Sequence, residues 1–219
     1  MVKMFPRKHR PRRLALETSR GRLIAAGKSL FARVGYEQTS TAAIARRAGT
    51  SESQLVRYFD GKAGLLQAIF DESWQPLNER ATALIGAAIN ARDAILGVVS
   101  AFVRAFAQDP ELAFLFLFES RRLRGTQHEV VLSKGFLAFE EVTRELIVRG
   151  QKDGSFSRGF SAAAIASAVR GTVEGMIRDR LQAERSGKVR PFSEREIEHV
   201  LSAMLAGLSG TPPAKPARR

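Results

Sequence analysis

Three side chains between residues 52 and 57 carry hydrogen-bonding groups that match the edges of nucleic-acid bases. The Gln54 amide can pair with adenine, the Glu52 carboxylate can accept from the amino group of cytosine, and Arg57 can pair with guanine or phosphate. Lys62 follows a turn near the start of a predicted helix, where a cation and free backbone amides together favour phosphate. A stabilising acid in the first turn of a helix explains Glu52 equally well.

The elements that must position these side chains are two short helices joined by a glycine. Ser40 or Thr39 can cap a first helix of small apolar residues at helical spacing. Gly49 ends this helix in a turn, where a positive φ is easiest for glycine. A second helix from about residue 51 to 58 packs Leu55 back onto the first. Helices joined in this way form a helix-turn-helix, whose second helix enters the DNA major groove, although an ordinary helical hairpin is the alternative.

Positive charge is concentrated in the same part of the chain. The whole chain has a net charge of +13. Up to Lys62 there are 14 Lys and Arg against 4 Asp and Glu, a net +10, and beyond it 21 against 18, a net +3. Such a domain attracts polyanions, and the commonest specific polyanionic partner of a protein is nucleic acid. A basic surface that only keeps the protein soluble is the alternative.

Four segments between residues 31 and 65 resemble a known family. FARVGYEQTS, TAAIARRAGTS, LVRYF and GKAGL are similar to the tetracycline-repressor (TetR) family of transcriptional regulators, and the match spans roughly residues 17–70. The resemblance implies phosphate contacts by Thr41, Tyr58 and Lys62, base contacts by Glu52, Ser53 and Gln54, and a base or backbone contact by Arg57. Two positions depart from the family, because Val56 stands where tyrosine is common and Ser53 where glycine is common.

The hydrophobic pattern predicts an all-α protein of about nine helices in two domains. An N-terminal three-helix helix-turn-helix domain, residues 17–70, precedes a larger helical domain for ligand binding and dimerisation, residues 71–210. A disordered basic arm, residues 1–16, and a disordered tail, residues 211–219, flank these domains. The arm could enter an adjacent minor groove through its arginines. No credible strand is predicted.

Most of the expected helices have recognisable start signals. Helices are expected at residues 62–74, 75–91, 93–106, from 110, and at 130–151, 161–184 and 193–208. Asp93 is the expected cap of one of them, and Ser161 is expected to begin another. Asp109 before Pro110 is a strong start signal, and Ser193 with a glutamate three residues later predicts a capping box.

The last two helices have apolar faces suited to dimerisation. The helix at 161–184 has a smooth stripe of small residues, Ala164, Ala168, Gly171 and Gly175. The last helix offers a seam of larger ones, Ile197, Val200, Leu201, Met204, Leu205 and Leu208. Together with the same pair from a second chain they could form a four-helix bundle, which predicts a homodimer. Packing of the stripe within one chain is the alternative.

The middle helices contain a high density of phenylalanines that could line an apolar effector cavity. They are Phe102, Phe106, Phe114, Phe116, Phe118, Phe136 and Phe139. Filling an ordinary core is the alternative for each of them. Arg121, Arg122 or Arg170 could hold an anionic head group, or lie solvated on the surface. A long apolar acid or thioester would suit this composition.

Several other functions are disfavoured by what the sequence lacks. There are no cysteines, and the histidines His9, His128 and His199 stand apart from any metal-binding or catalytic pattern. Gly61-Lys62 lacks the spacing of a phosphate-binding loop. We therefore expect no enzyme activity, no cofactor and no metal. Without a signal peptide or membrane segment, the expected location is the cytoplasm.

These observations together predict a ligand-responsive transcriptional repressor. It would bind a palindromic operator as a dimer and be released by a small apolar effector. A DNA-binding adaptor or architectural protein with a ligand-free second domain is the alternative.

Overall fold

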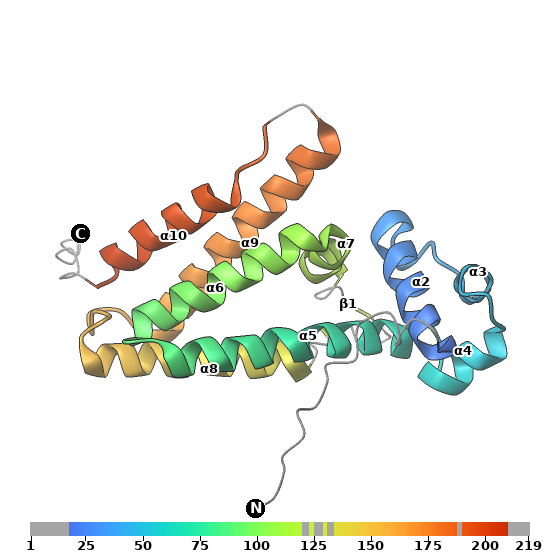
Figure 1. Ribbon diagram of the computed structural model, residues 1–219, viewed down its shortest axis with the longest axis horizontal. Helices are drawn as coiled ribbons and strands as arrows, with labels where there is room; N and C mark the ends of the chain where they lie inside the picture. Colours follow the sequence, from blue (N-terminus) through green and yellow to red (C-terminus); the bar gives the residue numbers. More distant parts are fainter. Residues whose placement is uncertain (1–17, 120–122, 125–128, 131–133, 188–189, 210–219) are drawn as a thin grey trace, which may run out of the picture. The chain divides into compact units, whose positions relative to one another are not determined.

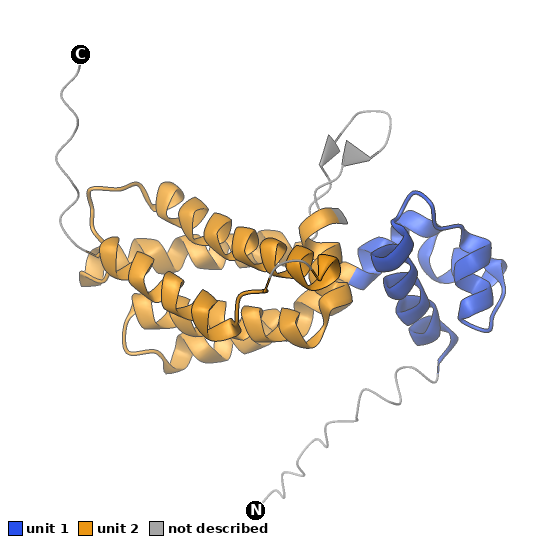
Figure 2. Cartoon of the chain, turned by 90° about the horizontal axis from the view of Figure 1, so that it is seen from above, with its two compact units in different colours: residues 1–69 blue, residues 70–219 orange. Residues whose placement is uncertain are grey.

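The computed structural model describes residues 18–119, 123–124, 129–130, 134–187 and 190–209. Nine α-helices lie within these residues, and the expected all-α fold is confirmed (Figure 1). The chain divides into two compact units, residues 1–69 and residues 70–219 (Figure 2). The predicted basic arm and C-terminal tail lie outside the described residues. No described helix is long and apolar enough to cross a membrane.

The first unit contains α2 (Ser19–Val34), α3 (Thr41–Arg47), α4 (Glu52–Phe59) and the first eight residues of α5 (Lys62–Ala87). A hydroxyl side chain caps each of the first three helices by accepting a backbone N–H from the first turn. The capping residues are Thr18 for α2, Ser40 for α3 and Ser51 for α4. Thr39, the other expected cap of α3, instead donates to the Gly35 carbonyl at 2.7 Å. The core of the unit consists of fully buried side chains, Leu23, Phe31, Ile44, Leu55, Leu65 and Ile69.

The turn between α3 and α4 has the geometry of a helix-turn-helix. Gly49 has a φ of +62°, the left-handed region that favours glycine. The Thr50 N–H donates to the Ala45 carbonyl at 3.0 Å and closes the turn. Ala45 is buried, and Leu55 on α4 is buried with it, so the two helices pack through small and apolar side chains. The helix-turn-helix prediction is confirmed.

Helix α5 is one continuous helix where the sequence predicted two. Pro76 lies inside it, although proline removes a helix hydrogen bond and usually ends or kinks a helix. The predicted break at this position was wrong. Pro76 is exposed, whereas Trp74, Leu77 and Ala81 are buried on either side of it. Burial of one face before and after the proline therefore outweighs the lost hydrogen bond.

The second unit is a layered helical bundle. It contains the rest of α5, α6 (Ala91–Gln108), α7 (Pro110–Phe114), the π-helix η1 (Leu115–Glu119), α8 (Lys134–Asp153), α9 (Ala162–Ser186) and α10 (Glu194–Gly207). Helix α6 contacts α8, α9 and α10 (Figure 1). Because α6 meets helices on several sides, it carries a long run of buried alanine, valine and phenylalanine residues.

Three of the four predicted start signals are confirmed. Asp109 accepts the Leu112 N–H at 3.1 Å, with proline at the first position of α7. Ser161 caps α9. Ser193 and Glu196 form the predicted capping box of α10, and the hydrogen bonds that the Ser193 backbone and hydroxyl donate lower the pKa of the Glu196 carboxyl.

The cap predicted for α6 was wrong. Asn90, not Asp93, caps this helix, and its side chain accepts the Asp93 N–H at 2.9 Å. The helix therefore begins at Ala91, and Asp93 is an acid in its first turn. Its negative charge there interacts favourably with the positive end of the helix dipole.

A small strand pair was not predicted. The strands β1 (Leu123–Arg124) and β2 (Glu129–Val130) pair antiparallel. The predictions of no strand and of a helix from residue 130 were therefore wrong, and α8 begins at Lys134. Strands of two residues are too short to show the alternating pattern by which strands are recognised.

Candidate nucleic-acid interface and ligand cavity

Helix α4 separates an apolar face from a polar one. Leu55 and Phe59 are buried, while Glu52, Ser53 and Arg57 are exposed. Tyr58, also predicted to contact DNA, is 40% exposed. The structure thus exposes four of the five predicted contact residues of α4 on the surface of the first unit, and Gln54 is the exception. This arrangement is the one that a recognition helix needs, because its polar side chains must reach base edges.

Arg57 and Tyr58 are coupled to each other. The Arg57 Nη2 donates to the Tyr58 hydroxyl at 3.4 Å, and the guanidinium lies 5.0 Å from the centre of the Tyr58 ring. A cation held over an aromatic face loses freedom before binding. The two side chains therefore present a positive charge and a hydroxyl to a partner as a pair.

Thr41 and Glu52 are also joined. The Thr41 hydroxyl donates to Glu52 Oε2 at 2.6 Å, and this bond links the first residue of α3 to the first residue of α4. A phosphate at Thr41 would have to take the place of this carboxylate, since two anions at one hydroxyl repel each other. The expected phosphate contact of Thr41 and base contact of Glu52 therefore require the bond between them to open.

Lys62 and Gln54, both expected to contact DNA, are less exposed than the other predicted contact residues of α4. Lys62 is half-buried, donates to the Tyr36 carbonyl at 2.9 Å and lies 4.3 Å from the centre of the Tyr36 ring. It ties the start of α5 to the loop after α2, and this bond occupies part of its donor capacity. Gln54 is half-buried, and its side-chain oxygen finds no hydrogen-bond partner among the described residues.

Two arginines of the first unit have structural bonds that sequence reasoning missed. Arg22 Nε donates to the Ala48 carbonyl at 2.9 Å, where it satisfies the end of α3. Arg47 Nη2 donates to the Ser29 hydroxyl at 3.3 Å. Residues 18–69 still have eight Lys and Arg against three Asp and Glu, a net +5, so the unit remains basic.

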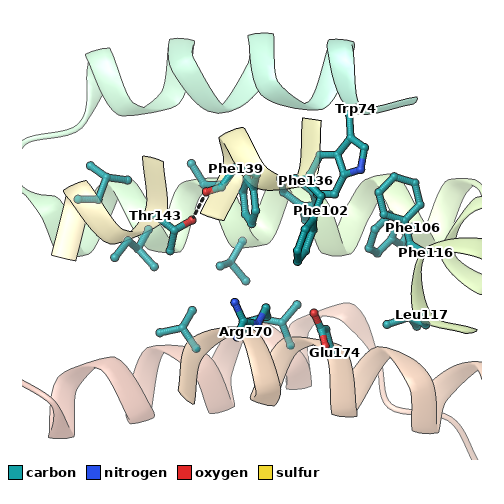
Figure 3. A pocket seen from close by; sticks show the side chains of 16 residues that line it. Trp74, Phe102, Phe106, Phe116, Leu117, Phe136, Phe139, Thr143, Arg170 and Glu174 are labelled. Atoms are coloured by element: carbon teal, nitrogen blue, oxygen red, sulfur yellow. Dashed lines mark hydrogen bonds between the residues drawn. The ribbon is translucent and has the colours of Figure 1, made fainter. Parts of the chain in front are cut away.

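A cavity of about 100 Å³ lies in the second unit between α5, α6, α8, α9 and the π-helix (Figure 3). Of the predicted effector residues, five line it, Phe102, Phe106, Phe136, Phe139 and Arg170. Phe116 lines it too. Arg170 and Glu174 approach from α9, across the cavity from Trp74 (Figure 3). Apart from these two charged residues and Thr143, the lining is apolar.

Trp74 is a lining residue that the sequence did not point to. It is 4% exposed, and its ring centre lies 4.8 Å from that of Phe116 and 5.5 Å from that of Phe139. The aromatic rings around it meet at tilted or edge-on angles, which is their favoured packing. Its position four residues after Phe70 on a helix was the only signal that could have placed it inside the bundle.

The other predicted effector residues lie elsewhere. Phe114 and Phe118 pack against each other, with 4.7 Å between their ring centres, and neither lines the cavity. The Arg185 guanidinium lies 3.9 Å from the centre of the Phe114 ring, at the far end of α9. Arg121 and Arg122 lie outside the described residues.

The small-residue stripe of α9 is not used within the described part of the chain. Ala164, Ala168 and Gly171 are exposed, and a methyl group added at Gly171 or Gly175 would meet nothing within 4 Å. The six residues of the seam predicted on α10 differ in burial, and two of them, Met204 and Leu208, are half-buried. The buried members of the seam pack within the protein, Ile197, Leu201 and Leu205. Val200 is 46% exposed, so part of each helix is left for another surface.

A basic helix-turn-helix unit joined to a helical unit with an apolar cavity defines a class, that of DNA-binding regulators with a ligand-binding body. The model of the family described as bacterial regulatory proteins, tetR family, matches residues 23–69 of this chain. Helices α3 and α4 lie wholly within the matched segment.

Relatives of similar length extend the likeness beyond the matched segment. The fatty acid metabolism regulator protein of Bacillus subtilis (strain 168) is 23% identical over 186 residues, 83% of this chain and 93% of the relative. Among solved structures, the fatty acid degradation regulator FadR from Bacillus halodurans has a TM-score of 0.76 at 18% identity, covering 86% of this chain and 95% of that one. FadR from Bacillus subtilis in complex with stearoyl-CoA has a TM-score of 0.74 at 19% identity, covering 87% and 98%.

Proposed function

We propose that this protein is a cytoplasmic transcriptional repressor that binds a palindromic operator as a homodimer and leaves it when an apolar effector binds. The observation that carries the proposal is the exposed polar face of α4 on a basic unit, together with an apolar cavity in the other unit. Thr41, Glu52, Ser53, Gln54, Arg57, Tyr58 and Lys62 are the proposed DNA contacts. Dimerisation would use the exposed stripe of α9 and the free side of α10.

The proposed effector carries a long apolar chain. The lining of the cavity is almost entirely aromatic and aliphatic, and a relative with the same fold was solved with stearoyl-CoA. A cavity of about 100 Å³ is smaller than the roughly 300–1,000 Å³ of ordinary ligand pockets. A long chain could therefore enter only if the surrounding helices move apart.

This need for movement supplies a mechanism for release. A dimer reads a palindrome only if its two recognition helices are about 34–36 Å apart. The cavity-lining Trp74 and the DNA-unit residue Lys62 both belong to α5, so displacement of α5 by a ligand would also move its first turns. A coupling of ~1–3 kcal/mol, which is typical of allostery, would weaken operator binding about 5- to 150-fold.

The cavity favours this function over that of a ligand-free adaptor or architectural protein. Such a protein would have no need of an apolar cavity beside a paired arginine, and a packed core would be more stable without it. A rise in melting temperature with stearoyl-CoA, and none with free coenzyme A, would support the regulator; no rise with either would favour the adaptor.

DNA binding should depend on the exposed face of α4. We expect Tyr58→Ala to weaken binding about 10-fold to the sequence that wild-type protein recovers from random DNA, because it removes a hydroxyl and frees Arg57 from its ring. Affinity should also fall steeply with salt. Fluorescence anisotropy of labelled DNA at several salt concentrations measures both effects.

A matched control lies on the same unit. Val34→Ala also truncates a side chain that is largely exposed, at the end of α2 and outside the proposed DNA contacts. It should leave affinity unchanged. Equal affinity of wild type and Tyr58→Ala, or a recovered sequence without two-fold symmetry, would contradict the proposed interface.

Trp74 should report ligand binding directly. It is the chain's only tryptophan and lines the cavity. We expect stearoyl-CoA to change its emission in a saturable way and to release DNA over the same concentration range, because one event displaces the rings around it. Free coenzyme A should do neither. Release of DNA without any change in emission would place the ligand outside this cavity.

A further inference from the structure

The cavity wall has an unusual charge balance for a site proposed to bind a fatty chain. Its described lining contains one cation, Arg170, and one carboxylate, Glu174. The remaining polar lining side chain is Thr143, whose hydroxyl donates to the Phe139 carbonyl at 2.8 Å. Among the described lining residues, a ligand entering this space therefore meets apolar surface, one cation and one carboxylate.

The positive group is already neutralised. Arg170 Nη1 is paired with Glu140 Oε1, and this ion pair joins α9 to α8. The side chains of Arg170 and Glu140 are 36% and 31% exposed, so the pair is partly withdrawn from water. Glu140 and Arg170 together carry no net charge. The arginine cannot offer its full charge to a second anion without giving up Glu140.

An ionised carboxylate inside the cavity would therefore lose its hydration, and among the described lining residues the one cation is already paired. Burial of an unpaired charge is strongly unfavourable, whereas an ester, thioester or alcohol oxygen loses much less on the same transfer.

We propose that Glu140 determines ligand specificity by occupying Arg170, so that the cavity accepts a chain whose buried end is uncharged and rejects an ionised fatty acid. This inference rests on the proposed function of the cavity as the effector site. It decides between the two chemistries that the sequence left open, an apolar acid and a thioester, in favour of the uncharged one. Glu140 does not line the cavity and acts through Arg170.

The test uses two probes of equal chain length, decanoate and 1-decanol, titrated into the full-length protein and followed by Trp74 emission and calorimetry. At pH 7.5, wild type should bind 1-decanol at least 10-fold more tightly than decanoate. Glu140→Gln should reduce this ratio about 10-fold, because Arg170 becomes available to the carboxylate. Glu140→Gln/Arg170→Gln should restore the wild-type preference, since the gain requires the arginine.

Glu141→Gln is the matched control. Glu141 is the next residue on α8, is 54% exposed and pairs with Arg144 instead, at 3.1 Å from Arg144 Nε. This substitution should leave the ratio unchanged. An unchanged ratio in Glu140→Gln, or an equal change in Glu141→Gln, would overturn the inference. If 1-decanol binds neither wild type nor variants, the cavity is not the effector site and the proposed function fails as well.

A measurement on wild type covers the case in which Glu140→Gln does not fold. Lowering the pH from 7.5 to 5.5 raises the uncharged fraction of a simple carboxylic acid roughly 100-fold. Decanoic acid should then approach 1-decanol in affinity, while the affinity of 1-decanol changes little. A constant difference between the two probes across this range would overturn the inference without any substitution.

Discussion

Replacement of Gly64 by alanine should destabilise the helix-turn-helix unit by about 3 kcal/mol and abolish DNA binding. A methyl group at Gly64 would overlap the carbonyl oxygen of Phe59, the last residue of α4. The obstacle is backbone, which cannot rotate away as a side chain could. Alanine is otherwise preferred over glycine in a helix by about 1 kcal/mol, so the steric conflict decides the sign. Native-state hydrogen exchange of the α3 and α4 amides measures the loss.

Gly86→Ala provides the control for this substitution. Gly86 is exposed near the other end of the same helix, and an added methyl group would meet nothing within 4 Å. This variant should be as stable as wild type or up to about 1 kcal/mol more stable, with unchanged DNA affinity. Protection of the α4 amides that is equal in Gly64→Ala and wild type would show that α5 can start against α4 in another way.

The close approach at Gly64 fixes the orientation of α4 relative to the start of α5. Only glycine lets α5 begin directly against the end of α4, and Lys62, two residues earlier, ties the same turn to the Tyr36 carbonyl. The polar face of α4 is therefore oriented by two features of α5, the missing side chain at Gly64 and the hydrogen bond of the half-buried Lys62. A DNA-binding surface gains affinity when its geometry is set before binding.

The helix-turn-helix could be predicted because its determinants are local. Gly49 with its positive φ and the buried pair Ile44 and Leu55 lie within twelve residues of one another, and their spacing alone defines the turn. The contacts made by Lys62 could not be predicted in the same way. Its bond to Tyr36 spans 26 residues and depends on how α2 and α5 pack. Sequence spacing carries no information on such a contact.

The cavity was predicted in composition but not in detail. The phenylalanines of α6 and α8 follow regular helical spacing, and those expected from these helices do line it. Phe116 and Phe118 lie on a π-helix, where the period of 3.6 residues fails. The sequence therefore could not tell that Phe116 faces the cavity while Phe118 packs against Phe114.

Long-range charge pairing was also beyond the reach of sequence. Arg170 was proposed from the sequence to hold an anionic head group, and it lines the cavity, but its partner Glu140 is 30 residues away on another helix. The Pro76 prediction failed for a related reason. A proline is a local signal for a helix end, and the burial of Trp74 and Leu77 that overrides it is a property of the folded bundle.

Filling the cavity should separate ligand response from DNA binding. Val173→Phe adds a ring to a lining residue of α9 that is half-buried. Apolar cavities of about 150 Å³ hold a benzene molecule, so the ring would take up most of this smaller space. Displacement of about three methylene groups of the ligand costs ~2–3 kcal/mol, and affinity for stearoyl-CoA should fall about 30- to 150-fold.

The same variant should still bind operator DNA like wild type, because Val173 belongs to the second unit and α4 to the first. It would then act as a repressor that no longer responds to its ligand. Val142→Phe is the control, since Val142 is exposed on α8 and does not line the cavity. Release of DNA from Val173→Phe at wild-type ligand concentrations would mean that the signal arises elsewhere. If Val173→Phe instead failed to hold DNA even without ligand, filling the cavity would be enough to move the helices. That result would contradict the expected phenotype but support the mechanism in which widening of the cavity releases DNA.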